Sequence, residues 1–230
     1  KMITDIYYVI PEIFISLGLM FLLLLGVFKK NGSSTVYSLS ILILIISIPL
    51  ILNVPSTTEL LIFNKSYKID YLSNFIKILI VISTLFVLLT SSQYLKSIKI
   101  YNVEYPILIL SSILGMMVMV SSNDLIVFYI GLELQSLALY VLASFNRDNV
   151  LSSESGLKYF VLSALSSGLL LYGCSLVYGF SSSTNFSQIS FNYGDSTQGI
   201  IFGMVFILVG LAFKISAVPF HMWAPDVYQG

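Results

Sequence analysis

The sequence has 230 residues, of which 57% are hydrophobic and only 10% carry a formal charge. Soluble globular domains usually contain about 25% charged residues, so this composition excludes an ordinary soluble fold and indicates a protein that crosses a membrane several times. The formal net charge is zero, which excludes the basic surface of a nucleic-acid-binding protein.

Long apolar segments follow one another along the chain, each long enough to cross or nearly cross a hydrocarbon core about 30 Å thick. We therefore predict an all-α, polytopic membrane protein with about seven transmembrane helices. The predicted spans are Ile6–Phe28, Thr35–Leu52, Asp70–Tyr94, Val103–Val120, Asp124–Phe145, Ser153–Tyr178 and Gln198–Met222.

The connections between the spans are polar. The first span ends at Lys29–Gly32 and the second at Asn53–Ser56, where glycine or proline interrupts the apolar pattern. The segment Thr58–Asp70 alternates enough to predict a short extramembrane hairpin. The polar stretch Phe180–Thr197 predicts a loop with room for one interfacial turn.

The last predicted span contains a lysine, a serine and a proline close together, at Lys214, Ser216 and Pro219. Because proline lacks an N–H and clashes with the preceding turn, we expect the helix to kink or open here. Open backbone at membrane depth occurs only where it is buried in protein or lines a wet cavity, and transporters use such broken helices to bind ions. The seventh helix is therefore predicted to be broken.

The distribution of basic residues predicts the orientation in the membrane. The side richer in lysine and arginine faces the cytoplasm or matrix, which places loops one, three and five there and the N-terminus outside. The inner side would carry Lys29, Lys30, Lys96, Lys99 and Arg147, against Lys1, Lys65 and Lys68 outside.

Three charged residues, Glu133, Lys158 and Lys214, lie inside apolar segments. An ionisable group at membrane depth is costly and usually marks an ion or proton path. Glu133 lies roughly 14 Å into its span by helical rise, where it is either a proton-exchanging carboxyl or a structural carboxyl bonded to a neighbouring helix. Lys214 has apolar residues on both sides, so its side chain cannot easily reach the interface.

Lys158 has three interpretations. It forms a surface pair with Glu154 one helical turn earlier, or it snorkels to the interface, or it pairs with Glu133 on the adjacent antiparallel helix. The pairing with Glu133 is the functional interpretation. His221 follows Lys214 in the same segment and is either a packing residue or a member of a proton relay.

Other polar residues inside the spans have simpler interpretations. Lys77 lies near the start of its span and is expected to snorkel, and Glu12 lies near a span end. A face of small residues in the sixth span is expected to allow close helix packing. It consists of Ser163, Ala164, Ser167 and Gly168.

The chain has one cysteine, Cys174, and one histidine, His221. These counts exclude an intrachain disulfide, an iron–sulfur cluster held by this chain alone, and a multi-histidine metal or haem site. The sequence has no P-loop and no G-x-G-x-x-G after a strand, so any nucleotide chemistry would take place on another subunit.

The second half of the sequence carries a family resemblance. The segments that carry it are Gly131–Leu137, Glu154–Phe160, Ser166–Gly173 and Phe213–Asp226. In their order and spacing they resemble NADH dehydrogenase subunit 2 (bacterial subunit N) of respiratory complex I, a family similar to monovalent cation/proton antiporters. The first part of the chain agrees with this family in hydropathy and little else.

The resemblance implies an antiporter-like fold of about fourteen helices, with two inverted repeats that each contain a broken helix. It also implies that Glu133, Lys158 and Lys214 belong to the proton path as the fifth-helix glutamate, the sixth-helix lysine and the broken-helix lysine. His221 matches the histidine of the family's proline–histidine–tryptophan segment.

The expected organisation is an N-terminal three-helix membrane segment at residues 1–102 and a first antiporter-like repeat at residues 103–230, incomplete at its C-terminal end. The expected function is that of a proton-translocating membrane-arm subunit of NADH:ubiquinone oxidoreductase. A subunit of a cation/proton antiporter and a non-conducting structural subunit are the alternatives. No cofactor is expected on this chain, since NADH, FMN, iron–sulfur clusters and ubiquinone would belong to other subunits.

The resemblance also implies partners and a location. The chain stops at Gln229–Gly230, just after the predicted break, so we expect a companion chain that supplies the C-terminal half. Other membrane-arm subunits of complex I and lipids are the remaining expected partners. The mitochondrial inner membrane is the expected location, with the bacterial plasma membrane as the alternative.

Overall fold

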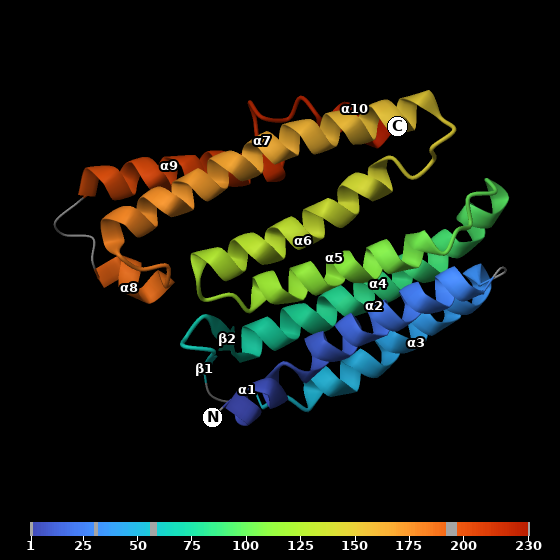
Figure 1. Ribbon diagram of the computed structural model, residues 1–230, viewed down its shortest axis with the longest axis horizontal. Coiled ribbons are helices and arrows are strands. Elements are labelled where there is room, and N and C mark those ends of the chain that lie inside the picture. Colours follow the sequence, from blue (N-terminus) through green and yellow to red (C-terminus); the bar gives the residue numbers. More distant parts are fainter. Residues whose placement is uncertain (1, 30–31, 56–58, 192–196, 230) are drawn as a thin grey trace. The chain divides into compact units, whose positions relative to one another are not determined.

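The computed structural model describes residues 2–29, 32–55, 59–191 and 197–229. Parts of three predicted connections, at residues 30–31, 56–58 and 192–196, lie outside the described residues, as does the N-terminal lysine. The described chain is helical apart from one hairpin (Figure 1). In chain order the elements are α1 (Met2–Tyr8), α2 (Ile10–Phe28), α3 (Ser33–Leu52), β1 (Leu60–Ile62), β2 (Tyr67–Ile69), α4 (Tyr71–Ser97), α5 (Glu104–Val120), α6 (Leu125–Ala143), α7 (Val150–Ser181), α8 (Phe186–Phe191), α9 (Thr197–Lys214) and α10 (Ala224–Gln229).

Each predicted span contains a helix. Five helices, α2, α3, α4, α6 and α7, are long and apolar enough to cross a membrane, and α5 and α9 are shorter apolar helices. Helix α8 supplies the turn predicted in the polar stretch after α7. The hydropathy prediction of a helical, polytopic membrane fold is therefore confirmed.

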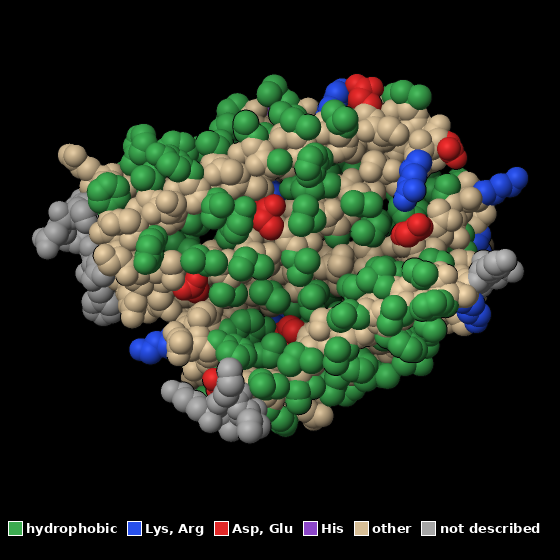
Figure 2. Space-filling view, viewed as in Figure 1, with side chains coloured by type: hydrophobic (Ala, Val, Ile, Leu, Met, Phe, Trp, Pro, Cys, Tyr) green, Lys and Arg blue, Asp and Glu red, His purple; other side chains and the backbone are tan. Residues whose placement is uncertain are grey.

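The surface of the protein is apolar. Figure 2 shows hydrophobic side chains over most of the visible face, with few charged groups. On α2, for example, Leu17 and Met20 are 60% and 61% exposed. Such a surface suits a hydrocarbon solvent, in which helices satisfy their own backbone hydrogen bonds.

The chain forms two compact units. The first contains Lys1–Ser122 and Ile130–Leu139, and the second contains Asn123–Tyr129 and Tyr140–Gly230. In the first unit α2 packs against α3 and α5, and α4 also packs against α3 and α5. The boundary predicted between residues 102 and 103 divides the chain differently, into an N-terminal segment and a repeat. That division stays a prediction.

The predicted hairpin is confirmed. Strand β1 pairs antiparallel with β2, with Leu60 opposite Ile69. The strand β2 also contacts the end of α5, because the amide of Lys68 donates to the carbonyl of Ser121 over 2.8 Å. The hairpin is therefore attached to the helices on its β2 side.

Asp70 connects the hairpin to α4 as a helix cap. Its carboxylate accepts the amide of Ser73 over 2.8 Å, and the hydroxyl of Ser73 accepts the amide of Asp70. Burial raises the pKa of Asp70, but the hydrogen bonds from Ser73 and the neighbouring ammonium of Lys68 outweigh this effect, so the pKa is lower than usual. The capped helix start is thus favoured while Asp70 is ionised.

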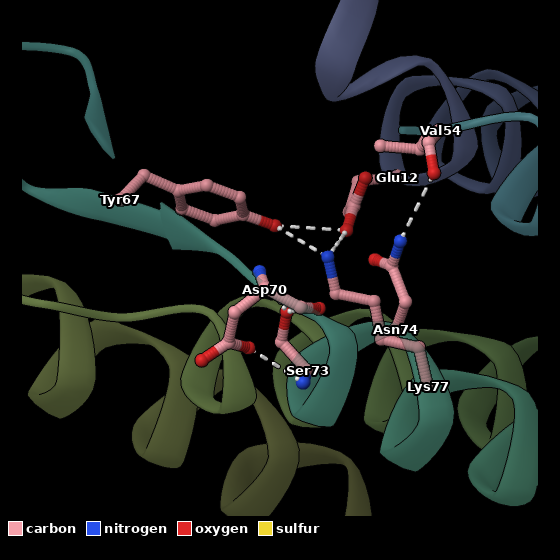
Figure 3. A network of polar contacts seen from close by, with 7 residues as sticks. All are labelled: Glu12, Val54, Tyr67, Asp70, Ser73, Asn74 and Lys77. Atoms are coloured by element: carbon pink, nitrogen blue, oxygen red, sulfur yellow. Dashed lines mark hydrogen bonds and ion pairs between the residues drawn. The ribbon is translucent and has the colours of Figure 1, made fainter. Parts of the chain in front are cut away.

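The prediction that Lys77 snorkels is wrong. Lys77 is only 2% exposed, and its ammonium nitrogen lies 2.6 Å from a carboxylate oxygen of Glu12, which is 4% exposed (Figure 3). The hydroxyl of Tyr67 donates to the same oxygen over 2.8 Å. A carboxylate from α2 therefore satisfies the lysine inside the protein, so the side chain does not need to reach water.

In the second unit, α7 packs closely against α9 through glycines. A Cβ atom added at Gly173 would lie 2.7 Å from the carbonyl oxygen of Gly203, a distance that real side chains do not reach. The predicted small-residue face is only partly involved: Ser163 and Ser167 are buried, but a Cβ at Gly168 would meet no atom within 4 Å. Glycines mark this helix contact together with Ser166, whose hydroxyl donates to the carbonyl of Gly210 over 3.0 Å.

Candidate site at the broken helix

Helix α9 ends at Lys214, inside the last apolar segment. The amide of Ala217 donates to the carbonyl of Ala212 over 2.8 Å, and the amide of Ser216 donates to the carbonyl of Phe213 over 3.1 Å. Ser216 has a left-handed φ of 55°. This pair of bonds is a Schellman motif, in which the left-handed position is usually glycine.

The predicted break is confirmed, but its cause differs from the prediction. The helix has already ended before Pro219, so proline does not kink it but lies in the non-helical segment that leads to α10. The indole N–H of Trp223 in this segment donates to the carbonyl of Phe213 over 3.1 Å. Its ring stacks on that of Tyr159 at 4.6 Å and 11°. The segment after α9 therefore folds back over the helix end.

Lys214 occupies the last turn of α9 and contacts an aromatic residue of α6. Its ammonium nitrogen donates to the hydroxyl of Tyr140 over 2.8 Å. The ring of Tyr140 meets those of Tyr159 and Phe160 edge to face, at 4.8 Å and 5.7 Å. The carbonyl end of a helix favours a cation, and a phenol hydroxyl can both accept and donate a proton. This arrangement can hold a lysine ammonium or pass a proton to the neutral lysine amine.

Lys158 lies between two carboxylates of the second unit. Its ammonium nitrogen is 2.7 Å from Glu154 and 2.8 Å from Asp226, on the first turn of α10. The pair with Glu154, the non-functional one of the three interpretations, is therefore present, and Asp226 is a partner that sequence reasoning missed. The three side chains line a pocket of about 110 Å³. Glu133 belongs to the first unit, so its pairing with Lys158 stays a prediction.

Glu133 lies on the part of α6 that belongs to the first unit, and its side chain is partly buried. This part of α6 packs against α5 at Gly131, where an added Cβ would lie 2.7 Å from the backbone nitrogen of Met119. Nearby, the hydroxyl of Ser136 is bonded to the carbonyl of Leu132, within the helix. The backbone that carries Glu133 is therefore held close to α5.

His221 lies between α9 and α10, with an exposed side chain, and its carbonyl accepts the amide of Ala224. Its expected role in a relay stays a prediction. Among the described residues, no group of three or more histidine, cysteine, aspartate or glutamate side chains is placed to hold a metal ion.

Residues 122–230 match the family model described as NADH:quinone oxidoreductase/Mrp antiporter, TM. Over 98% of its length the chain is 67% identical to NADH-quinone oxidoreductase subunit N of Pelagibacter ubique, and over 100% of its length it is 52% identical to subunit N of Bartonella bacilliformis. The chain is similar to subunit N along nearly its whole length. It covers 48% and 47% of these two proteins, so it spans about half the length of the curated relatives it matches.

A solved structure of respiratory complex I from Thermus thermophilus with bound aureothin contains a similar chain, with a TM-score of 0.79 and 27% identity. The match covers 96% of this chain and 47% of the other. The protein therefore has the antiporter-like membrane fold and crosses the membrane several times. The expected mitochondrial location is not supported, because these relatives are bacterial.

The partners that sequence reasoning missed are Tyr140, Asp226 and Trp223. Each lies far along the chain from the residue it contacts, so no local spacing predicts the contact. A partial signal was present for two of them, because Trp223 and Asp226 lie in the same resembling segment as Lys214. Tyr140 had no such signal.

Proposed function

We propose that this chain is part of a proton-translocating membrane-arm subunit of NADH:quinone oxidoreductase in a bacterial plasma membrane. The homology to subunit N supports the assignment to this complex. The observation that carries the proton-moving role is the end of α9, where Lys214 lies at an interrupted helix and is hydrogen-bonded to Tyr140. Interrupted helices of this kind bind ions in transporters.

The proposed path uses Glu133, Lys158 and Lys214, with His221 as a further relay member. Lys158 has carboxylate partners at 2.7 Å and 2.8 Å, so its charge is compensated on the side of Glu154 and Asp226. A change of partner from these carboxylates to Glu133 would alter the field at Lys214 and drive its proton onward. Moving one charge against 100 mV costs about 2.3 kcal/mol, which a change in one ion pair at low dielectric can supply.

The remaining chemistry of the complex is assigned to other chains. NADH, FMN, iron–sulfur clusters and ubiquinone would bind to other subunits, so this chain would carry protons but no electrons. Other membrane-arm subunits and lipids are the proposed partners.

The second candidate is a subunit of a cation/proton antiporter, which would use the same charged residues without redox partners. The description of the matching family model includes Mrp antiporters, which supports this alternative. A dependence of proton movement on sodium or potassium, without NADH, would favour it.

The test uses the full-length subunit in its assembled complex, in membrane vesicles. Glu133→Gln and Lys214→Met should each lower the number of protons pumped per NADH oxidised by about tenfold or more, because each removes a proton-exchanging group. Lys29→Met, at an exposed position after α2, is the matched control and should pump normally. Unchanged pumping in both variants would instead favour a structural, non-conducting subunit.

A further inference from the structure

Three polar residues in the first unit contact one another inside the protein. In the sequence they lie before all the residues of the proposed proton path. We name Glu12, Tyr67 and Lys77 the hairpin clasp (Figure 3). Lys77 is 2.6 Å from Glu12, the hydroxyl of Tyr67 donates to Glu12 over 2.8 Å, and Lys77 donates to that hydroxyl over 3.2 Å. All three side chains are at least 94% buried, because none is more than 6% exposed. The clasp thus joins α2, β2 and α4 through contacts that converge on one carboxylate oxygen, Oε1 of Glu12, while its Oε2 is buried without a hydrogen-bond partner.

The strand that carries Tyr67 also holds the end of α5. Tyr67 forms a backbone bridge with Ser122, and the amide of Lys68 donates to the carbonyl of Ser121 over 2.8 Å. Ser121 is only 1% exposed. Since the side chains of a strand alternate in direction, a slip of one residue would turn Tyr67 away from the ion pair. The clasp therefore determines the register of β2 and, through it, the position of the α5 end.

Helix α5 in turn holds the part of α6 that carries Glu133. A Cβ atom at Gly115 would lie 2.5 Å from the backbone nitrogen of Gln135, and one at Gly131 would lie 2.7 Å from that of Met119. The two backbones are therefore in direct contact, with no side chain between them to absorb a shift. A close-packed contact of this kind transmits displacement from one helix to the next.

We propose that the hairpin clasp is a positioning site for Glu133, acting through β2, the end of α5 and the α5–α6 contact. The role of Glu133 rests on the proposed function; the mechanical connection does not. A buried ion pair stabilises a fold no better than well-packed apolar side chains would. The role of the polar groups here is therefore specificity: they allow only one register of β2.

The experiment compares two clasp variants with a matched control, in the full-length subunit of the assembled complex. Tyr67→Phe removes only the hydroxyl that connects the strand with the ion pair. The paired variant Glu12→Leu/Lys77→Met removes both charges together, which leaves no uncompensated charge. Tyr71→Phe, at a position 75% exposed at the start of α4, is the control.

Both clasp variants should assemble. Amide hydrogen exchange at residue 68 should rise about tenfold, because the strand loses its bonds to a charged group. Exchange at residues 130–139 should rise as well, and the number of protons pumped per NADH should fall about twofold or more. The control should match the wild type in all three measurements.

Wild-type exchange and pumping in both clasp variants would overturn the proposal. So would faster exchange at residue 68 with no change at residues 130–139, because the clasp would then hold the hairpin alone. If Glu133→Gln itself pumps normally, the proposed function fails, and the exchange at residues 130–139 still decides whether the mechanical connection exists.

Discussion

At the scale of single residues, three lysines that the sequence places in apolar spans each contact a residue far away in the chain. Lys77 is held by Glu12, Lys158 by Asp226, and Lys214 by the neutral hydroxyl of Tyr140. Tyr140 is a neutral partner of Lys214, and its hydroxyl can both accept and donate a proton.

The contact between Lys214 and Tyr140 leads to a prediction. Tyr140→Phe removes the hydroxyl but keeps the ring that packs on Tyr159 and Phe160. We expect the complex to assemble normally while proton pumping per NADH falls by about tenfold, since a hydrogen-bonded relay group is lost. Simultaneous recording of NADH oxidation and vesicle acidification measures this ratio.

The matched control for this substitution is Tyr178→Phe, which removes a hydroxyl from an exposed position on α7. It should leave the ratio unchanged. Equal ratios for the two tyrosine variants would contradict a role of Tyr140 in proton transfer.

The interactions of Lys158 differ from those of Lys77. The side chains of Lys158, Glu154 and Asp226 are 41%, 53% and 46% exposed, whereas those of Lys77 and Glu12 are 3% and 5% exposed. The Lys158 pairs lie at the surface of the described chain, where the lysine has room to exchange partners. The Glu12–Lys77 pair is buried, and removal of one partner would leave an uncompensated charge.

At the scale of elements, glycines determine how close α7 and α9 lie. The nearest atoms to a Cβ at Gly173 are the carbonyl oxygen of Gly203 and the backbone nitrogen of Ile207, at 2.7 Å and 2.8 Å. Backbone atoms cannot move aside as a flexible side chain can. The two helices would have to separate to admit even a methyl group.

We therefore predict different effects on stability for two alanine substitutions on the same helix. Gly173→Ala should destabilise the subunit by about 1–3 kcal/mol through overpacking. Gly168→Ala meets no atom within 4 Å and should be neutral, or stabilising by up to about 1 kcal/mol, because alanine favours the helix. Thermal unfolding of the detergent-solubilised complex compares them. A similar loss of stability in both would contradict close contact with α9 as the cause, because Gly168 has no such contact.

At the scale of the whole molecule, the charge distribution predicts how the protein lies in the membrane. The predicted orientation places the connection before α4 outside and the end of α4 inside. Asn53→Cys and Ser97→Cys, both at exposed positions, report on the two sides. The native Cys174 is buried and should give little background.

A membrane-impermeant maleimide added to intact cells should label the cysteine at position 53 and not that at position 97. After the cells are opened, both should react. The reverse pattern in intact cells would show that the topology is opposite to the predicted one.

The sequence by itself determined the membrane class, the position of each long helix, the hairpin and the interruption beside Lys214. These features are local, because hydropathy, turn residues and helix-ending residues act over a few positions of the chain. The four resembling segments also identified the family, although they cover only part of the chain. Even here a local signal misled in detail, since α9 ends through Ser216 and not at Pro219.

Only the tertiary structure decided which groups meet. The pairs Glu12–Lys77, Asp226–Lys158 and Tyr140–Lys214 depend on which helices lie side by side and which of their faces touch. That arrangement follows from packing over the whole unit, including backbone contact at Gly173, and no short stretch of sequence contains it. For the same reason Lys77 looked like a snorkelling residue in the sequence and is a buried ion-pair member in the folded protein.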